Sequence, residues 1–168
     1  MFFVRSASEA DLPKVQALLS RSWHATYDGI YGADKVAEIT ASWHSLDLLK
    51  RRLAQPDSEF VVADDGRVIG GMAYAAMAKD EQDVVHLHQL YVEPHLMGQG
   101  IGRDLFAEVE TCFPAAKRMR LEVEPKNERA VRFYTGLGFH EVGWTKNCGV
   151  DQSGIPAVIL EKALSFPG

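Results

Sequence analysis

The residues best placed to do chemistry lie in the run HLHQLYVEPHLMGQGIG, from His86 to Gly102. The run begins as an apolar strand, breaks at Glu93-Pro94, and enters a glycine-rich turn ahead of an amphipathic helix over 101–113. Glycines let the main chain approach a ligand closely, and a helix N-terminus offers unpaired N–H groups with a partial positive charge. The run therefore predicts a turn that holds a phosphate group on backbone N–H donors.

The glycine turn alone leaves several interpretations open. A P-loop is excluded because the Gly-Lys-Ser/Thr that it requires is absent. A dinucleotide fingerprint needs a glycine where Arg103 stands, although Glu122 is available as the acid about 20 residues on. A tight strand-to-helix turn without any ligand is the remaining structural interpretation.

The periodicity along the chain predicts a mixed α/β domain. Asp65-Gly66 is typical of a two-residue hairpin turn. The strands at 84–92 and 119–124, joined by a helix, form a βαβ step, which makes them parallel and adjacent. The expected strands are 2–5, 59–63, 68–77, 84–92, 119–124, 139–146 and 155–164, and the expected helices are 10–22, 34–39, 45–53, 101–113 and 127–134.

Composition limits the classes of partner. The chain has 168 residues, 46% of them hydrophobic, which suits a single domain over residues 1–168. A formal net charge of −5 argues against nucleic acid or an anionic membrane as the main partner. We expect a cytoplasmic protein, because the N-terminus lacks a signal-peptide pattern and no apolar run is long enough to span a bilayer. Cys112 and Cys148 have no metal-binding spacing, so we expect free thiols and no metal.

Two stretches together carry a family resemblance. Leu90-Tyr91-Val92-x-Pro94 precedes the turn 98–102 and Leu105, and Asn127-x-x-Ala130-x-x-Phe133-Tyr134-x-x-Leu137-Gly138-Phe139 follows later. This pair of motifs at this spacing resembles the Gcn5-related N-acetyltransferase (GNAT) family. The resemblance implies an acyl-CoA N-acyltransferase fold: a mixed, mostly antiparallel sheet of six to seven strands with one parallel splayed pair, and helices on both faces.

The resemblance also implies acetyl-CoA as co-substrate. Its pyrophosphate is expected on the N–H groups of the turn, with its pantetheine arm along the strand that ends at Val92. Met97 departs from the family pattern, which usually has Arg or Gln there, and Arg103 in the first helical turn is a candidate to compensate. The expected acetyl-CoA contacts are Leu90, Tyr91, Val92, Met97, Gly98, Gln99, Gly100, Ile101, Gly102, Arg103, Asn127, Ala130, Phe133 and Tyr134.

Transfer of an acetyl group to an amine needs a base for the ammonium and an acid for the departing thiolate. His86 and His88 alternate onto one strand face and are candidate bases, because imidazole titrates near neutral pH. Glu122 on the neighbouring strand is a third candidate. The resemblance implies Tyr134 as the acid. For each of these residues a purely structural role is the competing interpretation.

The sequence says least about the acceptor. By resemblance, the region from Trp23 to Leu53 forms one wall of the acceptor site. Within it, Trp23, Tyr27 and Tyr31 are candidate substrate contacts. The N-terminal pattern is similar to the spermidine/spermine-type branch and to many uncharacterised members. We therefore expect a small primary amine or polyamine as acceptor, with a protein N-terminal or lysine amine as the alternative. A CoA-binding regulatory module without chemistry is the rival from another class, and a homodimer is also considered.

Overall fold

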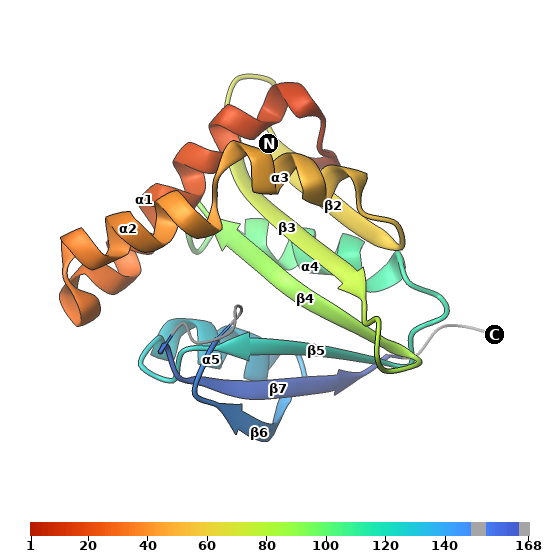
Figure 1. The fold of residues 1–168 in the computed structure, drawn as a ribbon. Coiled ribbons are helices and arrows are strands. Elements are labelled where there is room, and N and C mark those ends of the chain that lie inside the picture. The colour runs from red at the N-terminus through yellow and green to blue at the C-terminus, as the bar shows by residue number, and fades with distance from the viewer. Residues whose placement is uncertain (149–153, 165–168) are drawn as a thin grey trace. The chain divides into compact units, whose positions relative to one another are not determined.

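The computed structural model describes residues 1–148 and 154–164 (Figure 1). The strands form a seven-stranded mixed sheet in the order β1-β2-β3-β4-β5-β7-β6, which confirms the predicted fold class. The chain divides into two compact units, which are treated separately below. Unit 1 comprises Met1–Ala76 and Gln89–Cys112, and unit 2 comprises Met77–His88 and the described part of Phe113–Gly168.

Among the described residues, unit 1 holds four α-helices and two short 3-10 helices, which are labelled η1 and η2. It contains β1 (Phe3–Ser6), η1 (Glu9–Asp11), α1 (Leu12–Tyr31), α2 (Ala33–Trp43), α3 (Leu46–Ala54), β2 (Ser58–Asp64), nearly all of β3 (Ile69–Met77), the end of β4 (Val84–Val92), η2 (Pro94–Leu96) and α4 (Ile101–Thr111). β1 and β3 both pair antiparallel with β2. Among the described residues, no helix of the chain combines the length and apolar character needed to cross a membrane.

Helices cover both faces of the unit 1 strands, as predicted. Alternate residues of β2 and β3, among them Phe60 and Met72, share a buried cluster with Leu18 of α1 and Leu49 of α3. On the opposite face, a Cβ added to Gly71 would lie 2.9 Å from the Leu105 side chain of α4 and 2.9 Å from the backbone carbonyl oxygen of Tyr91. Glycine is therefore required where α4 packs closely on β3.

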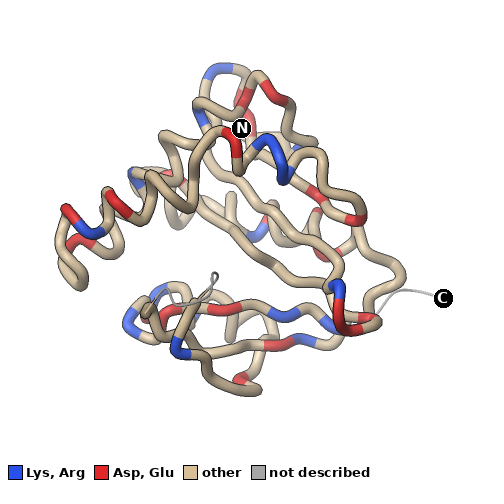
Figure 2. The backbone as a smooth tube through the Cα atoms, in the orientation of Figure 1, with Lys and Arg blue, Asp and Glu red and all other residues tan. Residues whose placement is uncertain are grey.

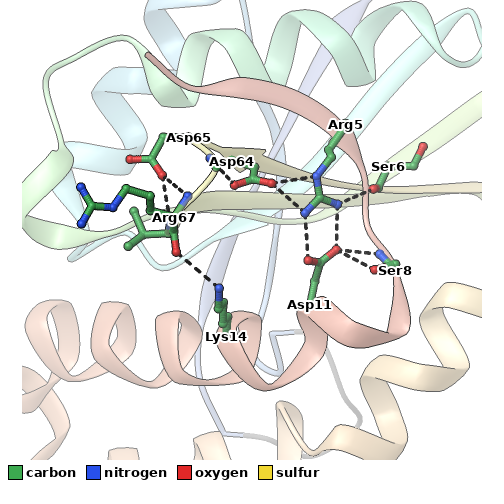
Figure 3. Close-up of polar contacts among 10 residues, drawn as sticks. Arg5, Ser6, Ser8, Asp11, Lys14, Asp64, Asp65 and Arg67 are labelled. Carbon is green, nitrogen blue, oxygen red and sulfur yellow. Dashed lines mark hydrogen bonds and ion pairs between the residues drawn. The ribbon is translucent and has the colours of Figure 1, made fainter.

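Arg5 of β1 bridges the carboxylates of Asp11, just before α1, and Asp64 of β2 (Figure 3). The Arg5 guanidinium donates to both oxygens of Asp11 at 2.8 and 2.9 Å, and its Nε donates to Asp64 at 3.0 Å. Asp11 also accepts from the backbone N–H of Ser8 at 2.8 Å, which completes a capping box. The arginine lowers the pKa of Asp11 to about 2, so this carboxylate is charged at any ordinary pH.

Unit 2 is built on the start of β4 and three further strands. β5 (Arg118–Val123), α5 (Glu128–Gly136), β6 (His140–Thr145) and β7 (Ala157–Ala163) complete it. Val84–His86 pair in parallel with Arg118–Arg120, as the predicted βαβ step requires, and β7 pairs antiparallel with both β5 and β6. Charges of both signs follow β5 and β7 (Figure 2).

The three largest differences from the predicted boundaries lie in α1, in α2 and in the β2–β3 connection. α1 ends at Tyr31 instead of residue 22, because Leu19, Trp23 and Tyr27 continue one buried helical face. α2 extends to Trp43 for a similar reason, with Val36 and Thr40 buried. The β2–β3 connection is four residues long, 65–68, and not two, because the Asp65 carboxylate accepts the N–H groups of residues 67 and 68 and holds them out of the strand.

Candidate active site

The glycine turn of unit 1 has the backbone geometry of an anion cradle. Gly98 and Gly100 have φ of +85° and +89°, a region that side chains rarely allow. A Cβ added at either position would meet no atom within 4 Å, so the surface of the turn is open. Gly100 caps α4, whose first-turn N–H groups have no acceptor within the helix. This geometry fits a phosphate group held by main-chain donors.

The side chains beside this turn supply little charge. Met97 is 40% exposed and offers a thioether where the family usually has a donor. Arg103 is exposed in the first turn of α4, two residues after Ile101, which is buried and anchors the helix. The turn therefore relies on its backbone and on the helix N-terminus, with Arg103 as the nearest cationic side chain along the chain.

The two histidines of β4 lie on one face of unit 2, as their alternation predicted. Their rings stack at 5.3 Å between centroids, with His86 half-buried and His88 exposed. Burial is the main cause that lowers the pKa of His86, while the Glu122 carboxylate acts against it and Arg120 acts with it. His86 is thus neutral at physiological pH, which is the form a general base needs.

Glu122 lies within electrostatic reach of His86 and beside Cys148. Burial, together with the Glu122 charge and a hydrogen bond to it, raises the pKa of Cys148 to about 12. The thiol therefore stays protonated and donates to the carboxylate. Both cysteines are free, as predicted, and neither is placed as a nucleophile, because burial also raises the pKa of Cys112.

Asn127 and Tyr134 mark the two ends of α5. Asn127 is the N-cap: its Oδ1 accepts the N–H of Ala130 at 3.2 Å, which confirms the predicted cap. Tyr134 is 9% exposed and packs edge-to-face against Phe133 and Phe139, at 5.2 and 5.6 Å between centroids. Helix and ring packing thus fix the position of the phenol before any ligand binds.

The aromatic residues expected to line the acceptor site lie along α1 in unit 1. Trp23 and Tyr27 are 5% and 6% exposed, and their rings contact each other at 4.5 Å between centroids. The Trp23 Nε1 donates to the Tyr91 hydroxyl at 3.1 Å. Tyr31 is half-buried and is the most accessible of the three. Burial favours a packing role for Trp23 and Tyr27, whereas Tyr31 is accessible enough for its predicted substrate contact to stay a prediction.

The same aromatic cluster contains polar residues that the sequence did not single out. His44 is 2% exposed, and its ring lies 5.8 Å from Trp23 and 6.5 Å from Tyr91 between centroids. Arg52 of α3 donates to the side chain of Gln89, which is 6% exposed. Helical spacing could have indicated Arg52 from the sequence, because it follows the buried Leu49 by three residues and so borders the buried face of α3.

Comparison with known proteins identifies the family. The acetyltransferase (GNAT) domain model matches residues 27–163. The chain therefore belongs to the GNAT acetyltransferases and is an acetyl-CoA-dependent N-acetyltransferase, as the paired motifs predicted. In the residues that the structure describes, no group of His, Cys, Asp and Glu side chains is arranged to hold a metal ion.

The relatives differ in what they acetylate. The chain is 28% identical to the peptidyl-lysine N-acetyltransferase YjaB of Salmonella typhimurium over 160 residues, 95% of this chain and 96% of that one. It is 32% identical to the N-alpha-acetyltransferase RimI of Mycobacterium tuberculosis over 94 residues, 55% and 59% of the two chains. The PaiA N-acetyltransferase of Thermoplasma acidophilum, solved with coenzyme A, has the same fold (TM-score 0.84, 23% identity, 97% and 99% coverage).

Proposed function

We propose that this enzyme acetylates a small primary amine by direct attack of the amine on acetyl-CoA in a ternary complex. The observation that carries the proposal is the open glycine cradle at the start of α4 in unit 1, and the neutral histidine on β4 in unit 2 separately supports it. Acetyl-CoA supplies an activated acetyl group as a thioester. The protein must bind it, remove a proton from the ammonium, and return a proton to the thiolate.

Binding of acetyl-CoA is assigned to the glycine turn and the end of β4. The N–H groups of residues 98–102 hold the pyrophosphate, with Arg103 adding positive charge. Leu90, Tyr91 and Val92 present a strand edge to the pantetheine arm. Met97 contributes its backbone only. Asn127, Ala130 and Phe133 of α5 are assigned contacts with the same arm through the family motif.

Proton transfer is assigned to unit 2. His86 is the preferred base, because its lowered pKa keeps it neutral, and His88 is the alternative on the same face. Glu122 influences His86 electrostatically and is the third candidate, acting directly or through water. Tyr134 donates its phenolic proton to the thiolate and is then reprotonated.

A protein amine is the second candidate acceptor. The peptidyl-lysine acetyltransferase YjaB matches nearly the full length of both chains, whereas the α-amine acetyltransferase matches just over half of each. This favours a lysine side chain over a protein N-terminus if the acceptor is a protein. The small amine remains our first proposal.

Release of free CoA from acetyl-CoA, measured over a panel of small amines and lysine peptides, tests the acceptor. We expect turnover above the no-acceptor rate with at least one small primary amine. We also expect the best small amine to have a higher kcat/KM than the best lysine peptide. Turnover with peptides alone would replace the first proposal by the second. No turnover with any amine, in a protein that binds CoA by calorimetry, would refute both acceptor classes.

Variants of the two proton-transfer groups test the mechanism. Tyr134→Phe should lower kcat about 100-fold while CoA affinity stays within about twofold, because the phenol acts on the leaving group and not on binding. His86→Ala should lower kcat similarly and remove the acidic limb of the pH profile, while His140→Ala, an exposed histidine on β6, should leave both unchanged. An unchanged kcat in either variant would remove that residue from its assigned role.

A further inference from the structure

Arg52 is a largely buried cation for which unit 1 provides no counter-charge. Its side chain donates to the amide oxygen of Gln89 and lies over the face of the Tyr74 ring, 5.3 Å from the guanidinium carbon to the ring centroid. No carboxylate within the described part of the chain forms an ion pair with it. A guanidinium has five N–H donors, and one hydrogen bond to Gln89 leaves most of them available.

The polar groups around Arg52 cannot neutralise its charge. Gln89 and Tyr74 are neutral side chains, and burial raises the pKa of Tyr74, so its phenol stays protonated. Burial, with a contribution from Arg52, lowers the pKa of His44 to about 4, so this imidazole is also neutral at physiological pH. The cluster therefore has a net positive charge in a poorly solvated environment, where an anion gains more than it would in bulk water.

A second polar group in the same cluster is also unsatisfied. The Nδ1 atom of His44 is buried and has no hydrogen-bond partner among the described residues. Leaving a buried polar atom unpaired costs about 1–3 kcal/mol, and such atoms are rare in native folds, so this one needs an explanation. His44 Nδ1 is thus a second polar atom of this cluster that no side chain of the described residues satisfies.

We propose that Arg52, oriented by Gln89 and lying over the Tyr74 ring, binds a carboxylate carried by the acceptor amine. The inference rests on the proposed function and narrows it, since the acceptor becomes an amino acid or related amino carboxylate. A planar carboxylate matches the arginine fork in a bidentate pair, which gives specificity as well as affinity. A polyamine is disfavoured, because its second ammonium would meet the Arg52 charge.

Matched acceptor pairs that differ in the carboxylate alone test the proposal. Release of CoA is compared for 4-aminobutyrate against 1-aminobutane, for 6-aminohexanoate against 1-aminohexane, and for glycine against glycinamide, with putrescine as the cationic counterpart. We expect the acid to exceed its neutral partner in kcat/KM by about tenfold or more at the best chain length. Equal kcat/KM within every pair, or a preference for putrescine, would overturn the proposal.

Variants of Arg52 assign the preference to this residue. Arg52→Gln should lower kcat/KM for the preferred acid about 10- to 100-fold, mainly through KM, and leave the neutral partner within about threefold. Arg52→Lys keeps the positive charge but loses the planar guanidinium. Its kcat/KM for the preferred acid should fall between those of the wild type and Arg52→Gln. Arg51→Gln, on the exposed side of the same helix, is the matched control and should change neither substrate. An equal loss for acid and neutral amines would show a structural role only.

A binding measurement separates this inference from the proposed function. Valerate carries a carboxylate but no amine, so it tests the site without turnover. We expect valerate, with CoA present, to raise the Tm of the wild-type protein and of Arg51→Gln but not that of Arg52→Gln. A Tm increase without turnover of any amine would refute the acceptor assignment and support the anion site. Turnover without carboxylate preference and without a Tm increase would refute the anion site alone.

Discussion

Arg120 of unit 2 and Arg52 of unit 1 are both held by neighbouring side chains, but only Arg120 is neutralised. Arg120 donates to Glu81 at 2.6 Å and to Glu161 at 2.9 Å, and these glutamates raise its pKa. Arg52 has an amide and aromatic rings around it, and burial lowers its pKa. One cation has two counter-charges, and the other has none among the described residues.

This difference separates a structural charge from one available to a ligand. A buried charge is costly to desolvate, and a protein that gains only stability from an arginine pairs it with carboxylates. The Arg120 network joins β5 and β7 with the turn before β4, so its charges are used within the fold. Arg52 bears the cost of desolvation without an ion pair to offset it among the described residues. This pattern is expected of a residue retained for binding.

The stability of two matched variants tests the comparison directly. Arg120→Gln should lower the free energy of unfolding by about 3 kcal/mol, because it leaves Glu161, with a side chain 11% exposed, without its closest counter-charge. Arg52→Gln should change it by less than about 1 kcal/mol, since it removes an uncompensated charge. Urea unfolding followed by circular dichroism measures both. An Arg52→Gln loss as large as that of Arg120→Gln would place Arg52 among the structural residues.

The sequence predicted most of the fold because its signals are local. Alternating apolar residues located the strands to within one or two residues, and β4 at Val84–Val92 matches its predicted range. Asn127 identified a helix start through its own side-chain chemistry. The C-terminal half of α1 was missed because bulky aromatics with two nearby glycines read as irregular, although tertiary burial of Trp23 and Tyr27 supports a helix there.

The candidate site was predictable where a motif fixes backbone geometry. It was less predictable where a role depends on which side chains lie next to each other in the folded protein. The positive φ values of Gly98 and Gly100 follow from residue type and spacing. The importance of Arg52 depends on which side chains surround it after folding, and that information is spread over α3, β3 and β4. No local pattern indicates that an arginine in a KRRLA segment lacks a carboxylate partner.

A second comparison sharpens the first, because His44 and His86 are both kept neutral by burial but in different settings. His86 has carboxylates within electrostatic reach that oppose the shift, whereas Arg52 adds to the shift at His44. The pKa of His44 therefore lies at about 4 in the folded protein, below the ordinary histidine value of 6.5. Between these values the unfolded chain binds more protons than the native one, so stability rises with pH across this window.

We expect His44 alone to cost the wild-type protein about 2 kcal/mol of unfolding free energy as the pH falls from 6.5 to 4. His44→Phe keeps an aromatic ring in the Trp23 and Tyr91 cluster and removes the titrating group, so its stability should vary less with pH by that amount. His140→Phe is the matched control, because His140 is an exposed residue of β6 in unit 2 and does not belong to the Arg52 cluster. Urea unfolding at half-unit pH steps gives the slope for each protein. If His44→Phe has the wild-type slope, the imidazole titrates as it does in water, and the cluster around Arg52 is then better solvated than the anion site requires.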